Sequence, residues 1–101
     1  MGTRATIKFT DEFDDVYYVY RGHDGFPDII LPDINAVIEK AKGRWSGSEM
    51  GLLLSMFFGE TYREKARIQD YELTPDFHGD ESYTYSVEYL DKGWVVSEIR
   101  D

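Results

Sequence analysis

The sequence predicts an α+β domain: an antiparallel β-sheet of about five strands in the chain order ββααβββ, with two helices packed on one face. Both ends of the chain alternate polar and apolar residues with a period of two, which is typical of half-buried strands. The middle of the chain carries apolar residues at helical spacing instead. With 42% apolar and 16% aromatic residues, the 101-residue chain is too apolar for disorder, and we expect a single domain over residues 1–101.

The first two strands are expected at residues 4–10 and 16–21. In the first, Ala5, Ile7 and Phe9 alternate with polar residues, so one face is buried. The second is β-branched and aromatic on both faces, which predicts a central strand. The acidic residues 11–15 between them are expected to form a solvated hairpin connection.

Two helices are expected next. Pro32 suits a first helical turn, because the missing N–H has no partner to lose there. Apolar residues then recur on one stripe at Ile34, Val37, Ile38 and Ala41. Ser48 is expected to cap a second helix, and residues 52–58 are apolar nearly all round, which predicts that this helix is buried.

The remaining chain predicts three strands, at residues 68–73, 82–90 and 94–99. Residues 91–93 make the tight turn between the last two. Residues 82–90 alternate most cleanly, with Tyr83, Tyr85, Val87 and Tyr89 on one face. These tyrosines lie either under the helices, as core, or towards solvent, as a stacking platform.

Charge and composition exclude several classes of function. The net charge of -9 argues against nonspecific binding to nucleic acid or to anionic membranes. The chain has no cysteine, which removes disulfides and thiolate metal sites and fits the host cytoplasm as location. No sequence pattern indicates a cofactor or a metal, and no residue is singled out as catalytic.

Two loops carry residues that suit a small ligand. Arg21, His23 and Asp24 converge where the second strand ends, and Arg44 and Trp45 lie at the expected connection between the helices. Trp and Arg are enriched in binding hot spots. Each loop also has a mechanical interpretation: residues 24–27 make a tight turn into a helix, and Trp45 folds back onto the core.

The only two histidines, His23 and His78, both lie beside an Asp and a Gly in expected loops. With nearby carboxylates they could supply a general base or ligate a metal. If the strand after the helices runs opposite to residues 16–21, however, its loop brings His78 to the other end of the sheet. We therefore expect each histidine to brace its own turn.

Two short segments resemble a known group of proteins. The chain begins Met1-Gly2-Thr3-Arg4, and after one hairpin reads Tyr20-Arg21-Gly22-His23-Asp24-Gly25-Phe26-Pro27. This is similar to short phage and prophage proteins with an M-G-T-R start and an aromatic-D-G-Y/F-P loop, although His23 stands where the aromatic residue is usual. The likeness covers roughly the first 30 residues and implies a small accessory gene of a mobile element, with no catalytic residues to transfer.

Three functions follow as hypotheses. The first is a binding protein whose negative surface inhibits a host nucleic-acid-binding complex by occupying its basic groove. That surface comprises Asp11, Glu12, Asp14, Asp15, Asp70, Glu72, Asp76, Asp80 and Glu81. The second is a small-molecule binder, for instance of a nucleotide signal, that uses the His23 loop with Arg44 and Trp45. The third is a histidine-based enzyme. A homodimer, through pairing of Tyr-rich strands at a sheet edge, is also possible.

Overall fold

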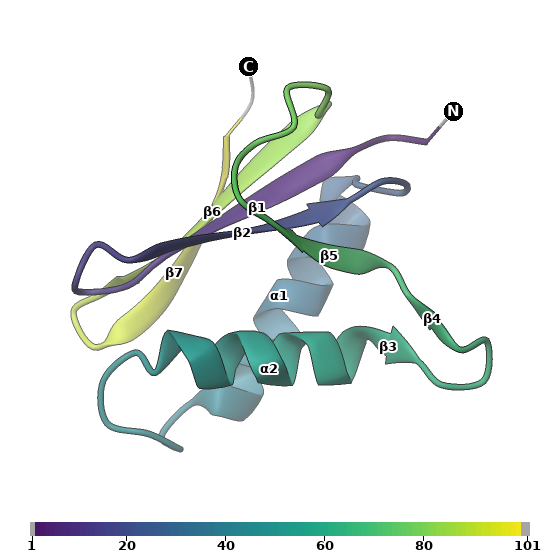
Figure 1. Ribbon diagram of the computed structural model, residues 1–101. Coiled ribbons are helices and arrows are strands. Elements are labelled where there is room, and N and C mark those ends of the chain that lie inside the picture. The colour runs from purple at the N-terminus through teal and green to yellow at the C-terminus, as the bar shows by residue number, and fades with distance from the viewer. Residues whose placement is uncertain (1, 100–101) are drawn as a thin grey trace.

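A five-stranded sheet and a pair of helices form the two layers of the protein (Figure 1). The computed structural model describes residues 2–99, and the strand order in the sheet is β5-β2-β1-β6-β7. The elements are β1 (Ala5–Thr10), β2 (Val16–Arg21), α1 (Pro27–Ala41), α2 (Met50–Thr61), β3 (Tyr62–Arg63), β4 (Ile68–Gln69), β5 (Tyr71–Thr74), β6 (Tyr83–Leu90) and β7 (Gly93–Ile99). The predicted α+β class, with two helices on one face of the sheet, is confirmed.

The prediction of a fully antiparallel sheet is wrong for one pair of strands. β1 and β6 are parallel, with Ala5 opposite Tyr83 and Thr10 opposite Glu88, while the other pairs are antiparallel. The cause lies in residues 75–82, which leave the edge strand β5 and return to the end of the sheet where β1 begins (Figure 1). There Ser82 N donates a hydrogen bond of 2.9 Å to Arg4 O, so β6 starts beside the start of β1.

The core lies between the helices and one face of the sheet. The sheet contributes Phe9, Val19 and Tyr85, each at most 1% exposed, because alternate residues of these strands point to the helices. Ile34 of α1 and Phe57 of α2 are equally buried against them. Tyr85 therefore faces the helices, which settles the orientation of the tyrosine stripe in β6.

Both helices begin differently from the prediction. α1 begins at Pro27, directly after the N-cap Phe26, and Pro32 lies inside the helix rather than in its first turn. Ser48 does not cap α2. Glu49 holds the N-cap position with a left-handed backbone (φ 45°), and Ser48 instead donates to Glu12 from both its backbone N–H and its hydroxyl. Both helices are present, but each begins at a residue other than the predicted one.

α2 is not fully buried as its composition predicts. Leu53 and Phe57 are buried, whereas Leu52 is 48% exposed and Gly51, Ser55 and Gly59 lie on the surface. The predicted strand at 68–73 is also divided: Ile68–Gln69 pairs with Tyr62–Arg63 in a small hairpin, and Tyr71–Thr74 pairs with β2. No helix within residues 2–99 is long and apolar enough to cross a membrane.

The predicted hairpin at the end of the chain is confirmed. β6 and β7 join through Asp91 and Lys92, whose φ angles of 50° and 64° are those that a two-residue hairpin turn requires. The register places Tyr89 opposite Trp94, with ring centroids 5.2 Å apart. This aromatic pair forms one wall of the pocket described below.

Candidate functional site

A cluster of charged side chains occupies the end of the sheet where β2 finishes. Its centre is Asp70, whose side chain is only 6% exposed. Its carboxylate accepts from Arg63 Nε at 3.0 Å and His23 Nε2 at 3.0 Å, and Arg21 Nη2 lies at 3.9 Å. Three basic groups therefore surround one buried carboxylate, so that Asp70 adds nothing to a negative surface.

Arg21 is the buried member of this cluster, with its side chain 9% exposed. Its Nε donates to His23 O at 2.7 Å, and its guanidinium lies 5.0 Å from the centroid of the Tyr71 ring. Asp33 of α1 lies 3.9 Å from Arg21 Nη1 and accepts a 2.6 Å hydrogen bond from the Tyr71 hydroxyl. Burial and this bond to Asp33 raise the pKa of Tyr71 above its usual range. The cluster links β2, β5, α1 and the β3–β4 hairpin, so its charged side chains stabilise the fold.

The loop after β2 packs on the start of the chain. Gly25 N donates to Thr3 O at 2.8 Å, and the Tyr85 hydroxyl donates to Gly25 O at 2.9 Å. A Cβ on Gly25 would lie 2.7 Å from Ala5 Cβ, and a Cβ on Gly2 would lie 2.8 Å from His23 Cα. The start of the chain and the loop after β2 thus contact each other, and this close approach explains both glycines. Asp24, at φ 53°, makes the turn and is exposed.

Trp45 lines a separate pocket at the other end of the protein. Its walls are the end of α1, the connection between the helices and the β6–β7 hairpin, and its volume is about 190 Å³. The lining residues are Ile38, Ala41, Lys42, Gly43, Trp45, Gly47, Tyr89, Lys92, Gly93 and Trp94. Lys42 and Lys92 are the only charged residues in this set. An adjoining open hollow of about 530 Å³ shares Trp45 and Lys92 and adds Glu12 and Ser46.

The structure does not bring the five predicted ligand-binding residues together. Arg21 pairs with Ala5 at one end of β1, whereas the β6–β7 hairpin extends beyond the other end, at Thr10. Five residue steps along a strand separate these ends by about 17 Å. Arg21 and His23 therefore belong to the Asp70 cluster, and Trp45 belongs to the pocket, where the Arg44 guanidinium lies 5.9 Å from its ring centroid.

Lys42, Tyr89, Lys92 and Trp94 are the pocket residues that sequence reasoning missed. A signal for two of them was present: the tight turn at 91–93 implies that residues 89 and 94 face each other across a hairpin. What the sequence did not show is that this hairpin lies beside the connection between the helices. That neighbourhood depends on the strand order, which places β6 and β7 at one edge of the sheet.

Several of the predicted acidic surface residues have internal partners. Asp11 accepts from the backbone N–H groups of Phe13 and Asp15, and Glu12 accepts from Ser48. Asp80 lies 3.3 Å from Arg4 Nη1. Asp76 accepts from the backbone N–H of Phe77 at 2.8 Å. Among the nine residues, Asp14, Asp15 and Glu72 are exposed and their side chains have no ion pair or hydrogen bond within the described part of the chain.

Glu81 holds the crossover loop to the sheet. Its carboxylate accepts from the backbone N–H of His78 at 2.8 Å and of Gly79 at 2.7 Å, and from the Thr6 hydroxyl. Burial alone would raise the pKa of Glu81, but these hydrogen bonds to the ionised form outweigh it and lower the pKa below its usual value. Glu81 is thus the residue that fixes the end of the crossover and the entry into β6.

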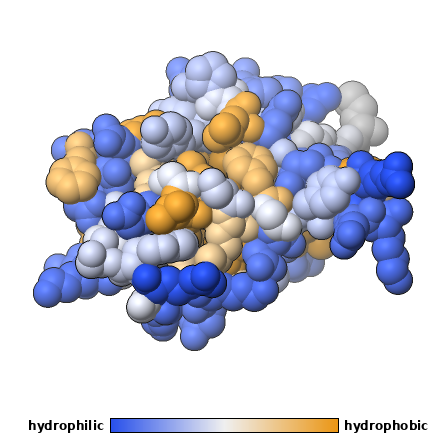
Figure 2. Space-filling view, turned by 60° about the horizontal axis from the view of Figure 1, so that its bottom comes forward, coloured by the Kyte–Doolittle hydropathy of each residue, from blue (hydrophilic) through white to orange (hydrophobic). Residues whose placement is uncertain are grey.

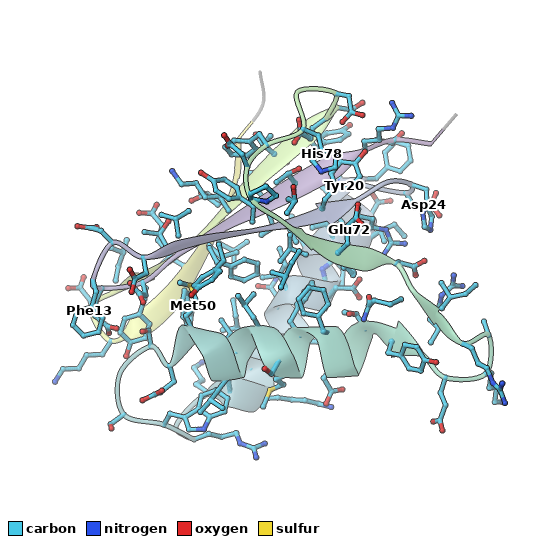
Figure 3. All side chains as sticks on the ribbon, viewed as in Figure 1. Phe13, Tyr20, Asp24, Met50, Glu72 and His78 are labelled. Carbon is cyan, nitrogen blue, oxygen red and sulfur yellow. The ribbon has the colours of Figure 1, made fainter. Side chains whose placement is uncertain are left out.

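The two histidines have separate surroundings, but not for the reason predicted. His78 stacks on Tyr20 with centroids 3.6 Å apart, and Tyr20 is adjacent to Arg21, so both histidines lie at the same end of the sheet (Figure 3). Tyr20 and Arg21 point to opposite faces, which keeps His78 apart from the Asp70 cluster. His78 Nε2 lies 3.1 Å from Thr74 Oγ1 at the start of its own loop, whereas His23 contacts Asp70 between β4 and β5. Among residues 2–99 no group of His, Asp and Glu suits a metal ion.

Comparison with known proteins gives no match: no family model, no curated protein and no solved structure resembles this chain. The assignment of function therefore depends on the geometry of the sites themselves.

Proposed function

We propose that the protein is a binding protein and that its ligand is a small planar anion held in the Trp45 pocket. The observation that carries this proposal is the composition of the pocket: two tryptophans and a tyrosine form its walls, and two lysines are its only charges. Lys42 also pairs with the exposed Glu39 at 3.5 Å, a contact that water screens, and Lys92 has no ion-pair partner in the described part of the chain. In a chain with a net charge of -9, a pocket whose only charged lining residues are lysines favours anions locally. Aromatic walls suit a flat ring by stacking.

The size of the pocket limits the ligand. Pockets for drug-sized ligands span roughly 300–1,000 Å³, so 190 Å³ accepts one ring system and not a whole nucleotide. A ligand with a base or similar ring in the pocket would extend its charged part into the adjoining hollow, where Lys92 lines both spaces. The one acidic residue of that hollow, Glu12, has its carboxylate bound by the backbone N–H and the hydroxyl of Ser48. A nucleoside monophosphate matches this division, because its ring is flat and its charge is at one end.

Titration with adenosine and guanosine monophosphates tests this proposal, followed by tryptophan fluorescence and by the melting temperature. We expect quenching of Trp45 and Trp94 and a rise in melting temperature with ligand concentration. The double variant Lys42→Ala/Lys92→Ala should weaken binding at least tenfold, whereas Lys65→Ala, outside the pocket, should not change it. No shift with either nucleotide, or equal binding by both variants, would reject the anion pocket.

A second candidate is binding to a basic protein surface through the β1–β2 hairpin. Phe13 at its tip is 77% exposed, the most exposed of the large hydrophobic side chains (Figure 3). Asp14 and Asp15 follow it, so the tip presents an apolar anchor beside two carboxylates. Such a tip suits a nucleic-acid-binding protein with an apolar hollow in a basic groove, and it supports the inhibitor hypothesis on a narrower surface than the sequence predicted.

Pull-down from a bacterial lysate at low and high salt tests this second candidate. We expect salt-sensitive capture of a nucleic-acid-binding protein, lost in Phe13→Ala and in Asp14→Asn/Asp15→Asn. Phe77→Ala is the matched control, because Phe77 is a second exposed phenylalanine, at 39%, but it lies in the crossover loop and packs on Tyr18. Capture that is unaffected by salt, or equally weakened in the control, would reject the hairpin as the binding element.

A further inference from the structure

The exposed side of α2 is unusual because Glu60, at its border towards α1, is its only charged residue. Its exposed arc contains Gly51, Leu52, Ser55 and Gly59, with Met56 and Phe58 half-buried at its borders. Glu60, the one charged residue of the helix, lies beyond this arc and pairs with Lys40 of α1 at 2.8 Å. Outer faces of helices on acidic proteins are normally charged, as α1 is with Asp28, Glu39 and Lys40. Figure 2, which brings this side of the molecule forward, shows apolar surface at the centre and hydrophilic surface around it.

The two ends of this uncharged face carry opposite charges. The N-terminal end of α2 lies beside Glu49 and the acidic β1–β2 connection, residues 11–15. Asp11 and Glu12 of this connection line one hollow together with Glu49 and Met50. After α2 the chain enters the β3–β4 hairpin (Figure 1). Its turn carries Lys65 and Arg67 together with one acidic residue, Glu64, so the net charge of the turn is positive. Both basic residues are exposed and have no ion-pair partner within residues 2–99. Lys42 and Arg44 in the connection before α2 offset part of the acidic charge, but the carboxylates of the β1–β2 connection and Glu49 outnumber them. α2 therefore lies between an end of net negative charge and an end of net positive charge, separated by about 18 Å of helix.

We propose that this face binds a second copy of the chain, with the two α2 helices antiparallel. A two-fold axis near Ser55 then places the acidic end of each copy against the basic end of the other, so that both ends gain an attractive contact. A parallel arrangement would put like charges together at each end. Antiparallel helices also oppose their dipoles favourably.

The shape of the face suits a helix as its partner. Gly51, Ser55 and Gly59 are spaced four residues apart, and a Cβ added to either glycine would meet nothing within 4 Å. A facing helix can therefore approach closely along this row, because interaxial distance depends on the side chains at the contact. Leu52 and Met56 beside the row would be covered by the partner, which removes their exposed apolar surface from water. The long-range repulsion between two acidic chains is screened beyond about 8 Å at physiological salt, so the local contacts decide the association.

This inference is independent of the Trp45 pocket, but a basic partner of the hairpin would compete with the second copy. The test therefore uses the purified protein alone, by analytical ultracentrifugation at physiological salt. We expect a dimer for the unchanged protein. Ser55→Trp should weaken association at least tenfold, and circular dichroism shows whether this exposed substitution leaves the fold intact.

Charge reversal tests whether the opposite charges at the two ends of α2 hold the dimer together. Lys65→Glu/Arg67→Glu makes both ends of α2 acidic. Asp14→Lys/Asp15→Lys/Glu49→Lys leaves only Asp11 and Glu12 against three new lysines, so that both ends carry a net positive charge, and each variant alone should be monomeric. Mixed together, they should form a heterodimer, because each contact then joins an acidic end to a basic end. A monomeric unchanged protein, a dimer that survives Ser55→Trp, or a mixture that stays monomeric would overturn the proposal. A dimer formed through the open edge of β7 would survive Ser55→Trp and would be recognised in this way.

Discussion

Replacing Asp70 by Asn tests whether the buried charge cluster holds the fold together. The substitution keeps the shape of the side chain but removes its charge and replaces one acceptor oxygen by a donor. That donor must then face either Arg63 Nε or His23 Nε2, both of which lie 3.0 Å from the carboxylate. Arg21, with its side chain 9% exposed, keeps Asp33 at 3.9 Å as its remaining charged partner.

The size of the effect follows from the exposure of each partner. Breaking a buried pair by removing one partner costs roughly 3–5 kcal/mol, and Asp33 compensates part of this for Arg21, so we expect Asp70→Asn to cost about 2–3 kcal/mol. The side chain of Arg63 is 56% exposed. Its contact with Asp70 is therefore screened by water, and Arg63→Ala should cost less than about 1 kcal/mol.

Urea unfolding at neutral pH, followed by the fluorescence of Trp45 and Trp94, measures both quantities. Glu72→Gln is the control, because Glu72 is an exposed acidic residue of the neighbouring strand β5. In thermal unfolding, Asp70→Asn should lower the melting temperature by roughly 10–20 °C. If Asp70→Asn stays within about 0.5 kcal/mol of the unchanged protein, or Arg63→Ala is equally costly, then burial does not set the strength of this cluster.

Three further changes test other parts of the fold. Gly25→Ala places a Cβ 2.7 Å from Ala5 Cβ and should destabilise by about 1–3 kcal/mol; a thermal unfolding curve that does not change would contradict close packing here. The pKa of Glu81 is lowered in the folded state, so its ionised carboxylate adds to the free energy of unfolding above the usual pKa of 4.5, and this addition is lost as pH falls through the folded-state pKa. In urea titrations at several pH values, Glu81→Gln should have a lower free energy of unfolding at neutral pH and a smaller loss of it on acidification. Because the pKa of Tyr71 is raised in the folded state, the free energy of unfolding should fall as pH rises above 10.0. Tyr71→Phe loses the 2.6 Å hydrogen bond to Asp33 and should remove part of this alkaline slope. An unchanged slope would show that Tyr71 does not cause it.

The strands could be predicted because their signal is local. Alternation over residues 5–10 fixes which side chains face the helices, and the structure keeps that face in Ala5, Ile7 and Phe9. The β6–β7 hairpin was predictable for a similar reason, since its turn joins strands that are adjacent in sequence. In these segments the pattern of burial and the pairing are decided by the same few residues.

The parallel pairing of β1 and β6 has no such local signal. It depends on where residues 75–82 pass, and this path is fixed by Glu81, which binds Thr6 and the backbone at residues 78 and 79. A carboxylate in a loop looks the same in the sequence whether it faces solvent or anchors a crossover. For that reason Glu81 was predicted as part of an acidic surface, and the direction of β6 was predicted wrongly.

The candidate sites show the same limit. Trp45 was singled out by residue type, but its partners Tyr89 and Trp94 come from a hairpin about half the chain away, which only the strand order brings to it. Arg21 and His23 were expected to bind a ligand, yet they are occupied by Asp70. Asp70 lies in the predicted strand at 68–73, between Gln69 and Tyr71 and close to Glu72. Nothing in this segment distinguishes a buried carboxylate from a solvated one.

In a chain with a net charge of -9, the basic residues are more informative about binding than the acidic ones. Several carboxylates serve the fold, through Asp70, Glu81 and Glu12, so their number overstates the negative surface. Two pairs of basic residues without a buried partner lie where the proposed binding occurs: Lys42 and Lys92 line the Trp45 pocket, and Lys65 and Arg67 lie beyond the far end of α2. Because these two places are at opposite ends of the helix, each pair of substitutions is the control for the other. Lys42→Ala/Lys92→Ala should weaken ligand binding at least tenfold and leave the dimer intact. Lys65→Glu/Arg67→Glu should dissociate the dimer and leave ligand binding unchanged.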